Sequence, residues 1–112
     1  PIGVAAEVGL DRAIVAVNGR GRGWPEARQF RTLGAAALEL CLVADGGLDG
    51  YVNLDHRGHG PWDYLGGLLI VEEAGGVIAE LDGLDPVVLD HAARRTLIAA
   101  SGPSLLEDLV GS

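Results

Sequence analysis

Basic residues are scarce in this sequence of 112 residues: eight Lys and Arg stand against sixteen Asp and Glu, which gives a formal net charge of −8 at pH 7. Nucleic acids and anionic membranes are bound by an excess of Lys and Arg that neutralises phosphate groups. The composition therefore argues against a nucleic-acid partner and against a membrane surface. It is compatible with carboxylates that bind a divalent cation.

Cysteine is nearly absent, methionine is absent, and the apolar runs are short. Cys41 is the one cysteine. No internal disulfide can form, so we expect a reducing compartment, the cytoplasm. The chain starts at Pro1 and contains no methionine. Either an initiating methionine was removed or, as we expect, the chain is an excerpt from a longer protein. The longest apolar run, residues 64–71, is far shorter than the roughly 20 residues needed to span a bilayer.

The apolar residues that are present, 48% of the chain, are enough for the core of a single domain. Strands are predicted at residues 13–17, 48–54, 77–81 and 96–100, with a further short one at 87–89; helices are predicted at 33–45, at 62–74 and from 102 onward. Strands alternate with helices. This order predicts the α/β class, with helices on both faces of a sheet.

The first two predicted helices carry few charges and are apolar almost all round. Such helices have to be covered on more than one side, so they could leave an adhesive surface exposed in this chain. The glycine pairs 46–47 and 75–76 are expected to end them. For the last helix, Ser104 and Glu107 have the spacing of a capping box.

Asp63 is the strongest candidate for chemistry. It lies one residue after Pro61-Trp62, at a predicted helix start, with Gly66 and Gly67 on the next turn. The helix dipole stabilises a carboxylate there, and a carboxylate on rigid backbone suits a hard cation. On these local features alone an ordinary first-turn Asp remains the favoured interpretation, because acidic first turns are common.

A family resemblance changes that balance. Residues 61–67 (Pro-Trp-Asp-Tyr-Leu-Gly-Gly) and 70–77 (Ile-Val-Glu-Glu-Ala-Gly-Gly-Val) closely resemble the second signature of the inositol monophosphatases. Upstream, residues 31–41 (Arg-Thr-Leu-Gly-Ala-Ala-Ala-Leu-Glu-Leu-Cys) look like the family's Arg-x-x-Gly-(Ser/Thr)-Ala-Ala helix start. Residues 48–51 (Leu-Asp-Gly-Tyr) are similar to its next strand.

The resemblance implies a mixed central sheet flanked by helices on both faces, as in the C-terminal half of the inositol monophosphatase and fructose bisphosphatase fold. It implies that Asp63 is a Mg²⁺ ligand that also contacts substrate hydroxyls, and that Gly34, Ala35 and Asn53 border the substrate. Ala35 lacks the hydroxyl that is usual there, and Asn53 is uncharged where relatives bind inositol with a Glu. The implied substrate is a small sugar or polyol monophosphate, with inositol itself left open.

The resemblance also implies missing parts. The family's N-terminal half supplies a Glu and an Asp-Pro-Ile-Asp-Gly-Thr motif, which this sequence lacks; Asp85-Pro86 begins like that motif but is interpreted as a turn. Residues 1–112 are therefore expected to be one C-terminal domain, inactive alone, whose partners are the N-terminal half and, as is common in the family, a second copy in a homodimer.

Several alternatives stay open. Within the superfamily the substrate could instead be histidinol phosphate, fructose bisphosphate or 3′-phosphoadenosine 5′-phosphate. A different class of function is a non-catalytic half-domain that binds a separate partner chain.

Overall fold

A mixed five-stranded sheet forms the centre of the molecule. The structure is a computed structural model that describes residues 2–18, 27–31, 36–53, 60–81, 83–90 and 92–111. The strands are β1 (Ile14–Asn18), β2 (Gln29–Arg31), β3 (Gly50–Asn53), β4 (Val77–Glu80) and β5 (Leu97–Ala100). Their order across the sheet is β2-β1-β3-β5-β4. β1 pairs in parallel with β2 and β3, whereas β5 pairs antiparallel with β3 and β4.

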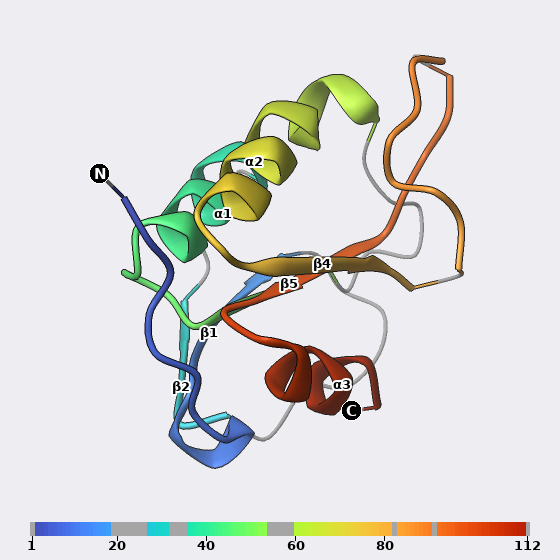
Figure 1. Cartoon of the computed structure of the whole chain (residues 1–112). Coiled ribbons are helices and arrows are strands. Elements are labelled where there is room, and N and C mark those ends of the chain that lie inside the picture. The colour runs from blue at the N-terminus through green and yellow to red at the C-terminus, as the bar shows by residue number, and fades with distance from the viewer. Residues whose placement is uncertain are drawn as a thin grey trace.

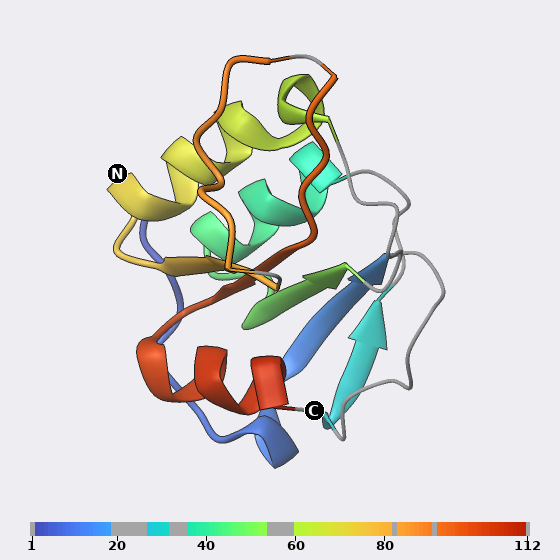
Figure 2. The same ribbon diagram turned by 90° about the vertical axis from the view of Figure 1, so that its right-hand side faces the viewer.

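Helices cover both faces of this sheet (Figures 1 and 2), as the sequence predicted. α1 (Ala36–Ala44) and α2 (Pro61–Glu73) lie side by side on one face. α3 (Pro103–Gly111) and the short 3-10 helix η1 (Leu10–Arg12) lie on the other. Among these described elements, no helix reaches the length and hydrophobicity of a bilayer-spanning segment.

Alternation along the strands divides the core in two, because successive side chains of a strand point to opposite faces. Ala16 and Tyr51 pack against α1 and α2. Val15, Val17 and Val52 pack on the opposite side, together with Leu105 of α3. The apolar run at residues 13–17 is thus buried on both faces of the sheet, as predicted.

The two glycine pairs end their helices as predicted. Gly46 has φ of 87° and Gly75 has φ of 95°, a left-handed conformation that costs glycine little because it has no Cβ. Gly67 has a different role: a Cβ built there would lie 2.9 Å from the Cβ of Leu40. α1 and α2 therefore approach each other at a point where only glycine fits without movement.

The predicted short strand at residues 87–89 is wrong. The backbone of this stretch has no regular structure, and the amides of Val87 and Ala92 donate to the carboxylates of Asp85 (2.9 Å) and Asp90 (3.0 Å). Local Asp carboxylates compete in this way with a strand ladder. Asp85 thus forms the turn that its sequence context indicated.

The strand β2 was not predicted. Gln29-Phe30-Arg31 contains a single apolar residue, so its sequence carries no alternation that would reveal a strand. Its parallel register with β1 (Ile14↔Gln29, Ala16↔Arg31) forms only in the folded chain. Pairing with a neighbour, not local propensity, makes this segment a strand.

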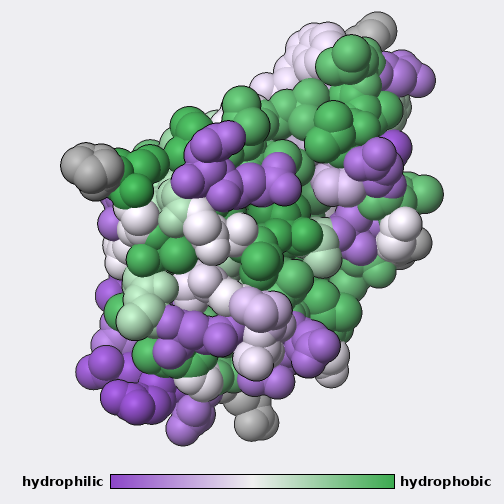
Figure 3. Space-filling model, viewed as in Figure 1, coloured by the Kyte–Doolittle hydropathy of each residue, from purple (hydrophilic) through white to green (hydrophobic). Residues whose placement is uncertain are grey.

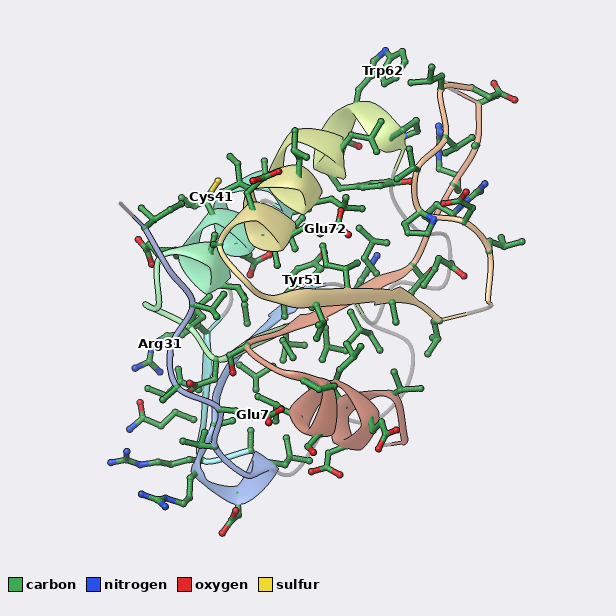
Figure 4. The ribbon with its side chains drawn as sticks, in the orientation of Figure 1. Glu7, Arg31, Cys41, Tyr51, Trp62 and Glu72 are labelled. Carbon is green, nitrogen blue, oxygen red and sulfur yellow. The ribbon has the colours of Figure 1, made fainter. Side chains whose placement is uncertain are left out.

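The predicted capping box of α3 is also wrong. α3 begins at Pro103, so Ser104 lies inside the helix instead of preceding it. The free amide of Leu105 in the first turn donates to Oε2 of Glu7 at 2.9 Å, and Figure 4 shows Glu7 directed toward this helix. A carboxylate distant in sequence thus caps α3, a pairing that no local pattern could reveal.

Candidate functional site

The elements that resemble a phosphatase signature meet at one edge of the sheet. The parallel strands β1 and β3 end there, at Asn18 and Asn53, which are register partners. α1 leads back to the start of β3, and α2 follows its end, so both helices begin at this same edge (Figure 2). The carboxyl ends of parallel strands and the N-termini of the adjoining helices are where open α/β sheets bind ligands.

Asp63 lies at this edge, in the first turn of α2. Gly60 is the extended N-cap residue and Pro61 occupies the first helical position, which suits proline because its missing N–H has no helical partner. The amide of Asp63 donates to the carbonyl of Gly60 at 3.0 Å. Its side chain is exposed. The helix dipole stabilises the negative charge of this carboxylate, which is open to an ion or a ligand.

Asn53 lies at the same edge, but its side chain is not accessible to solvent as that of Asp63 is. It is fully buried, and as the alternate residue to Tyr51 it lies on the face of the sheet that α1 and α2 cover. Gly34 and Ala35 fall outside the described residues, immediately before α1. The substrate contacts assigned to these three residues stay predictions. Asn18, the register partner of Asn53, was not singled out from the sequence.

A hydrogen-bonded link next to Asp63 was also missed. The hydroxyl of the buried Tyr64 donates to the carbonyl of Pro86 at 2.7 Å, and Nε of Arg95 donates to the carbonyl of Asp85 at 2.8 Å. The first bond attaches the β4–β5 connection to the first turn of α2, and the second lies within that connection. No sequence signal identifies the bond between Tyr64 and Pro86, because the two residues are 22 positions apart.

Glu80 fixes both ends of the same connection. Its carboxylate is buried and accepts the amide of Leu84 at 3.1 Å and that of Thr96 at 2.9 Å. Burial raises the pKa of the Tyr64 phenol above 10.0; Arg95 lowers it, while Glu80 and Asp85 raise it further. Tyr64 is therefore a neutral donor at physiological pH, and the β4–β5 connection is firmly held beside Asp63.

Carboxylates do not gather around Asp63 within the described ranges. No group of three or more His, Cys, Asp or Glu side chains there is placed to hold a metal ion. Hydrolysis assisted by two metals needs several ligands that hold the ions roughly 3.5–4 Å apart. The described part of the site therefore offers one ligand, Asp63, and further ligands would have to come from elsewhere.

The sequence comparisons match the chain to one family. The model of the inositol monophosphatase family matches residues 5–111. Inositol monophosphatase 2 of Solanum lycopersicum is 40% identical over 113 residues, which cover 97% of this chain and 40% of that protein. Nus factor SuhB of Escherichia coli is 40% identical over 67 residues, 60% of this chain and 24% of that protein.

Solved structures share the fold. A hypothetical protein of Pyrococcus horikoshii with similarities for inositol-1 monophosphatase superimposes with a TM-score of 0.82 at 30% identity, over 99% of this chain and 45% of that one. An inositol monophosphatase from Anabaena gives 0.78 at 29% identity, over 99% and 46%. The chain thus spans less than half the length of these relatives.

Proposed function

Because the chain belongs to the inositol monophosphatase family, we propose that it is part of a Mg²⁺-dependent phosphatase that hydrolyses a small sugar or polyol monophosphate. The observation that carries this proposal is Asp63, an exposed carboxylate in the first turn of α2 at the edge where the parallel strands end. The described residues fit one ligand of such an ion and do not complete its coordination.

Each residue at the edge has a distinct proposed task. Asp63 would be a ligand of the cation and would also contact a substrate hydroxyl, which an exposed carboxylate can do because it has two oxygens. Asn53, with Gly34 and Ala35 before α1, forms the wall of the substrate site. Mg²⁺, when bound, supplies positive charge for the phosphoryl oxygens and makes water more acidic. The remaining carboxylates come from the N-terminal half of the enzyme, which acts in the cytoplasm as a homodimer.

The polarity of the edge favours a neutral polyol over a cationic substrate. Asn53 offers an amide where a carboxylate would attract positive charge, and Ala35 offers no hydroxyl. Inositol phosphate is one member of this class; histidinol phosphate, fructose bisphosphate and 3′-phosphoadenosine 5′-phosphate are the alternatives. Release of inorganic phosphate from each of the four, by the enzyme that contains both halves, decides among them.

The decisive variant is Asp63→Asn in that complete enzyme. Loss of a direct carboxylate ligand should raise the Mg²⁺ concentration for half-maximal activity and lower kcat by about 100-fold or more, while the melting temperature stays within a few degrees. Asp108→Asn, an exposed Asp on α3 at the far side of the sheet, is the matched control. If the two variants needed the same Mg²⁺ concentration for half-maximal activity, Asp63 would not be a metal ligand.

A second candidate is a binding role without catalysis. The Escherichia coli relative is called a Nus factor, not a phosphatase, and the described residues of this chain hold a single carboxylate at the candidate site. This alternative predicts that the complete protein releases no phosphate from any of the four substrates at any Mg²⁺ concentration.

A further inference from the structure

The basic residues of this acidic chain are not spread evenly. Residues 12–31 contain five of the eight arginines and a single acid, Glu26, whereas the rest of the chain has three basic residues against fifteen acids. Arg20 and Arg22 lie outside the described residues, so the surface described below is built from the other three arginines of this segment. A local reversal of charge of this kind attracts anionic partners.

The fold brings these three arginines to one side of the sheet. Arg12 ends η1 and Arg28 directly precedes β2; the amide of Arg28 donates to the carbonyl of Ala13 at 3.0 Å, so the backbone at Arg28 lies next to that of η1. Arg31 ends β2. All three arginines and Gln29 are exposed, and in Figure 3 hydrophilic residues gather over η1 and β2, at the lower left. We call the surface formed by Arg12, Arg28, Gln29 and Arg31 the arginine edge.

β2 is the outermost described strand on this side of the sheet. It pairs with β1 and, among the described strands, with no other. Figure 2 shows β2 at the margin of the sheet, and in Figure 4 the side chain of Arg31 points outward, away from the sheet. Nη2 of Arg31 donates to Oε1 of Gln29 at 2.7 Å, which orients the guanidinium. An edge strand can pair with an extended peptide through backbone hydrogen bonds.

The side chains of the arginine edge select the charge of such a peptide. A guanidinium presents a rigid fork of N–H donors that matches a carboxylate, and it is less strongly hydrated than an ammonium. A second copy of β2 would bring arginines against arginines, and like charges across a strand pair are destabilising. The arginine edge therefore opposes pairing with its own copy and favours a segment of opposite charge.

The acids around the arginine edge limit the length of that partner. Asp11 is an exposed residue of η1, and α3, which packs against η1, exposes Glu107 and Asp108. A nucleic acid has a phosphate at every nucleotide, so it would extend past the arginines and meet these acids. A short peptide can end before them, and it also gains the backbone hydrogen bonds of β2. The observations thus favour a short acidic peptide over a nucleic acid.

We propose that the arginine edge binds a short acidic segment of another protein, which lies extended beside β2 and pairs its carboxylates with Arg12, Arg28 and Arg31. These residues are separate from Asp63 at the start of α2. The proposal therefore goes beyond the proposed function, and it holds whether or not the complete protein releases phosphate.

The test measures binding of fluorescein-labelled peptides to the complete protein by fluorescence anisotropy. A peptide that alternates Glu and Thr over about eight residues, an ordinary strand length, should bind, and the same peptide with Lys in place of Glu should not. Raising the salt concentration from about 0.05 to about 0.2 M should weaken binding several-fold, since exposed ion pairs are screened. Equal binding of the Glu and Lys peptides would overturn the proposal.

A second peptide tests the extended arrangement. Proline in place of alternate Thr residues keeps the charge but removes backbone donors, so this peptide should bind about tenfold more weakly. Equal affinity of the two acidic peptides would mean that the segment does not pair with β2, and would overturn the arrangement proposed.

Variants of the protein locate the contact. Arg12→Gln and Arg28→Gln should each raise the Kd of the acidic peptide by about two- to fivefold, and the double variant by about tenfold, as expected for exposed ion pairs. Arg94→Gln is the matched control, because Arg94 is an exposed arginine in the β4–β5 connection, at the opposite margin of the sheet. It should leave Kd unchanged. Equal effects of the Arg28 and Arg94 variants would overturn binding at this edge.

Two further results would identify a different partner and contradict the proposal. The first is tighter binding of single-stranded RNA than of the acidic peptide at equal charge, weakened by the same two variants. The second is a change of oligomeric state in the double variant, measured by sedimentation, because a second copy would then occupy the edge. Selective loss of acidic-peptide binding in the Arg12 and Arg28 variants, with an unchanged rate of phosphate release, would uphold the proposal independently of the proposed function.

Discussion

The two helical layers of this protein lie on opposite faces of the same sheet, and they differ in the side chains that they expose on the side away from it. α3 is amphipathic: Leu105 and Leu109 are buried while Glu107 and Asp108 meet solvent. α1 and α2 bury Leu40, Tyr64, Leu68 and Val71 against the sheet and expose further apolar residues on the other side. The difference teaches that α3 closes one face of the fold with a polar surface, whereas α1 and α2 leave large apolar side chains exposed on their outer side.

Neighbouring leucines on α2 give the strongest test of this comparison. Leu68 is 4% exposed within the core below the helix, and Leu69 is 58% exposed. Leu68→Ala should cost about 2–4 kcal/mol of unfolding free energy, because it leaves a cavity, and Leu69→Ala should change it by less than about 0.5 kcal/mol. Urea unfolding of the chain alone measures both; similar losses would mean that both leucines are core residues.

The glycine pair on α2 sharpens the contrast between its two sides. Gly67 faces Leu40, so Gly67→Ala should force α1 and α2 apart and cost about 1–2 kcal/mol. Gly66 faces open space, so Gly66→Ala should stabilise by about 0.5–1 kcal/mol through helix propensity. Thermal unfolding of the two variants should shift in opposite directions. A shift in the same direction would contradict the close approach of the helices.

Tyr64 tests how α2 is held to the β4–β5 connection. Tyr64→Phe removes the donor to the carbonyl of Pro86 and should cost about 1–2 kcal/mol. Burial raises the pKa of Tyr64 in the folded state above 10.0, so the unfolded chain releases the phenol proton first. The contribution of Tyr64 is complete below pH 10 and is lost as pH rises through the folded-state pKa. Urea midpoints above pH 10 should therefore fall less steeply for the Phe variant.

The smallest expected effect lies on the α3 side. Glu7→Gln keeps an oxygen acceptor for the amide of Leu105 but removes the charge that favours a helix N-terminus, so about 0.5–1 kcal/mol should be lost. Glu107→Gln is the control, because Glu107 lies beyond the first turn. A larger loss of unfolding free energy for the Glu107 variant would instead support the capping box expected from the sequence.

Much of the fold was predictable because its strands and helices follow from patterns that span only a few residues. The apolar run at residues 13–17 indicated β1, and the glycine pairs placed the ends of α1 and α2 within a residue or two. At the candidate site, Asp63 was singled out by the family signature of residues 61–67 and 70–77 together with its place in an acidic first turn, and both are local features of the chain.

What the sequence alone determined, then, was the alternation of strands and helices, the family, and the residue at the start of α2. The tertiary structure decided β2, the capping of α3 by Glu7 and the link from Tyr64 to Pro86. It also decided which side of α1 and α2 is left uncovered. The physical reason is that propensity and periodicity act over a few residues, whereas each of these contacts pairs polar groups or surfaces that only the folded chain brings together.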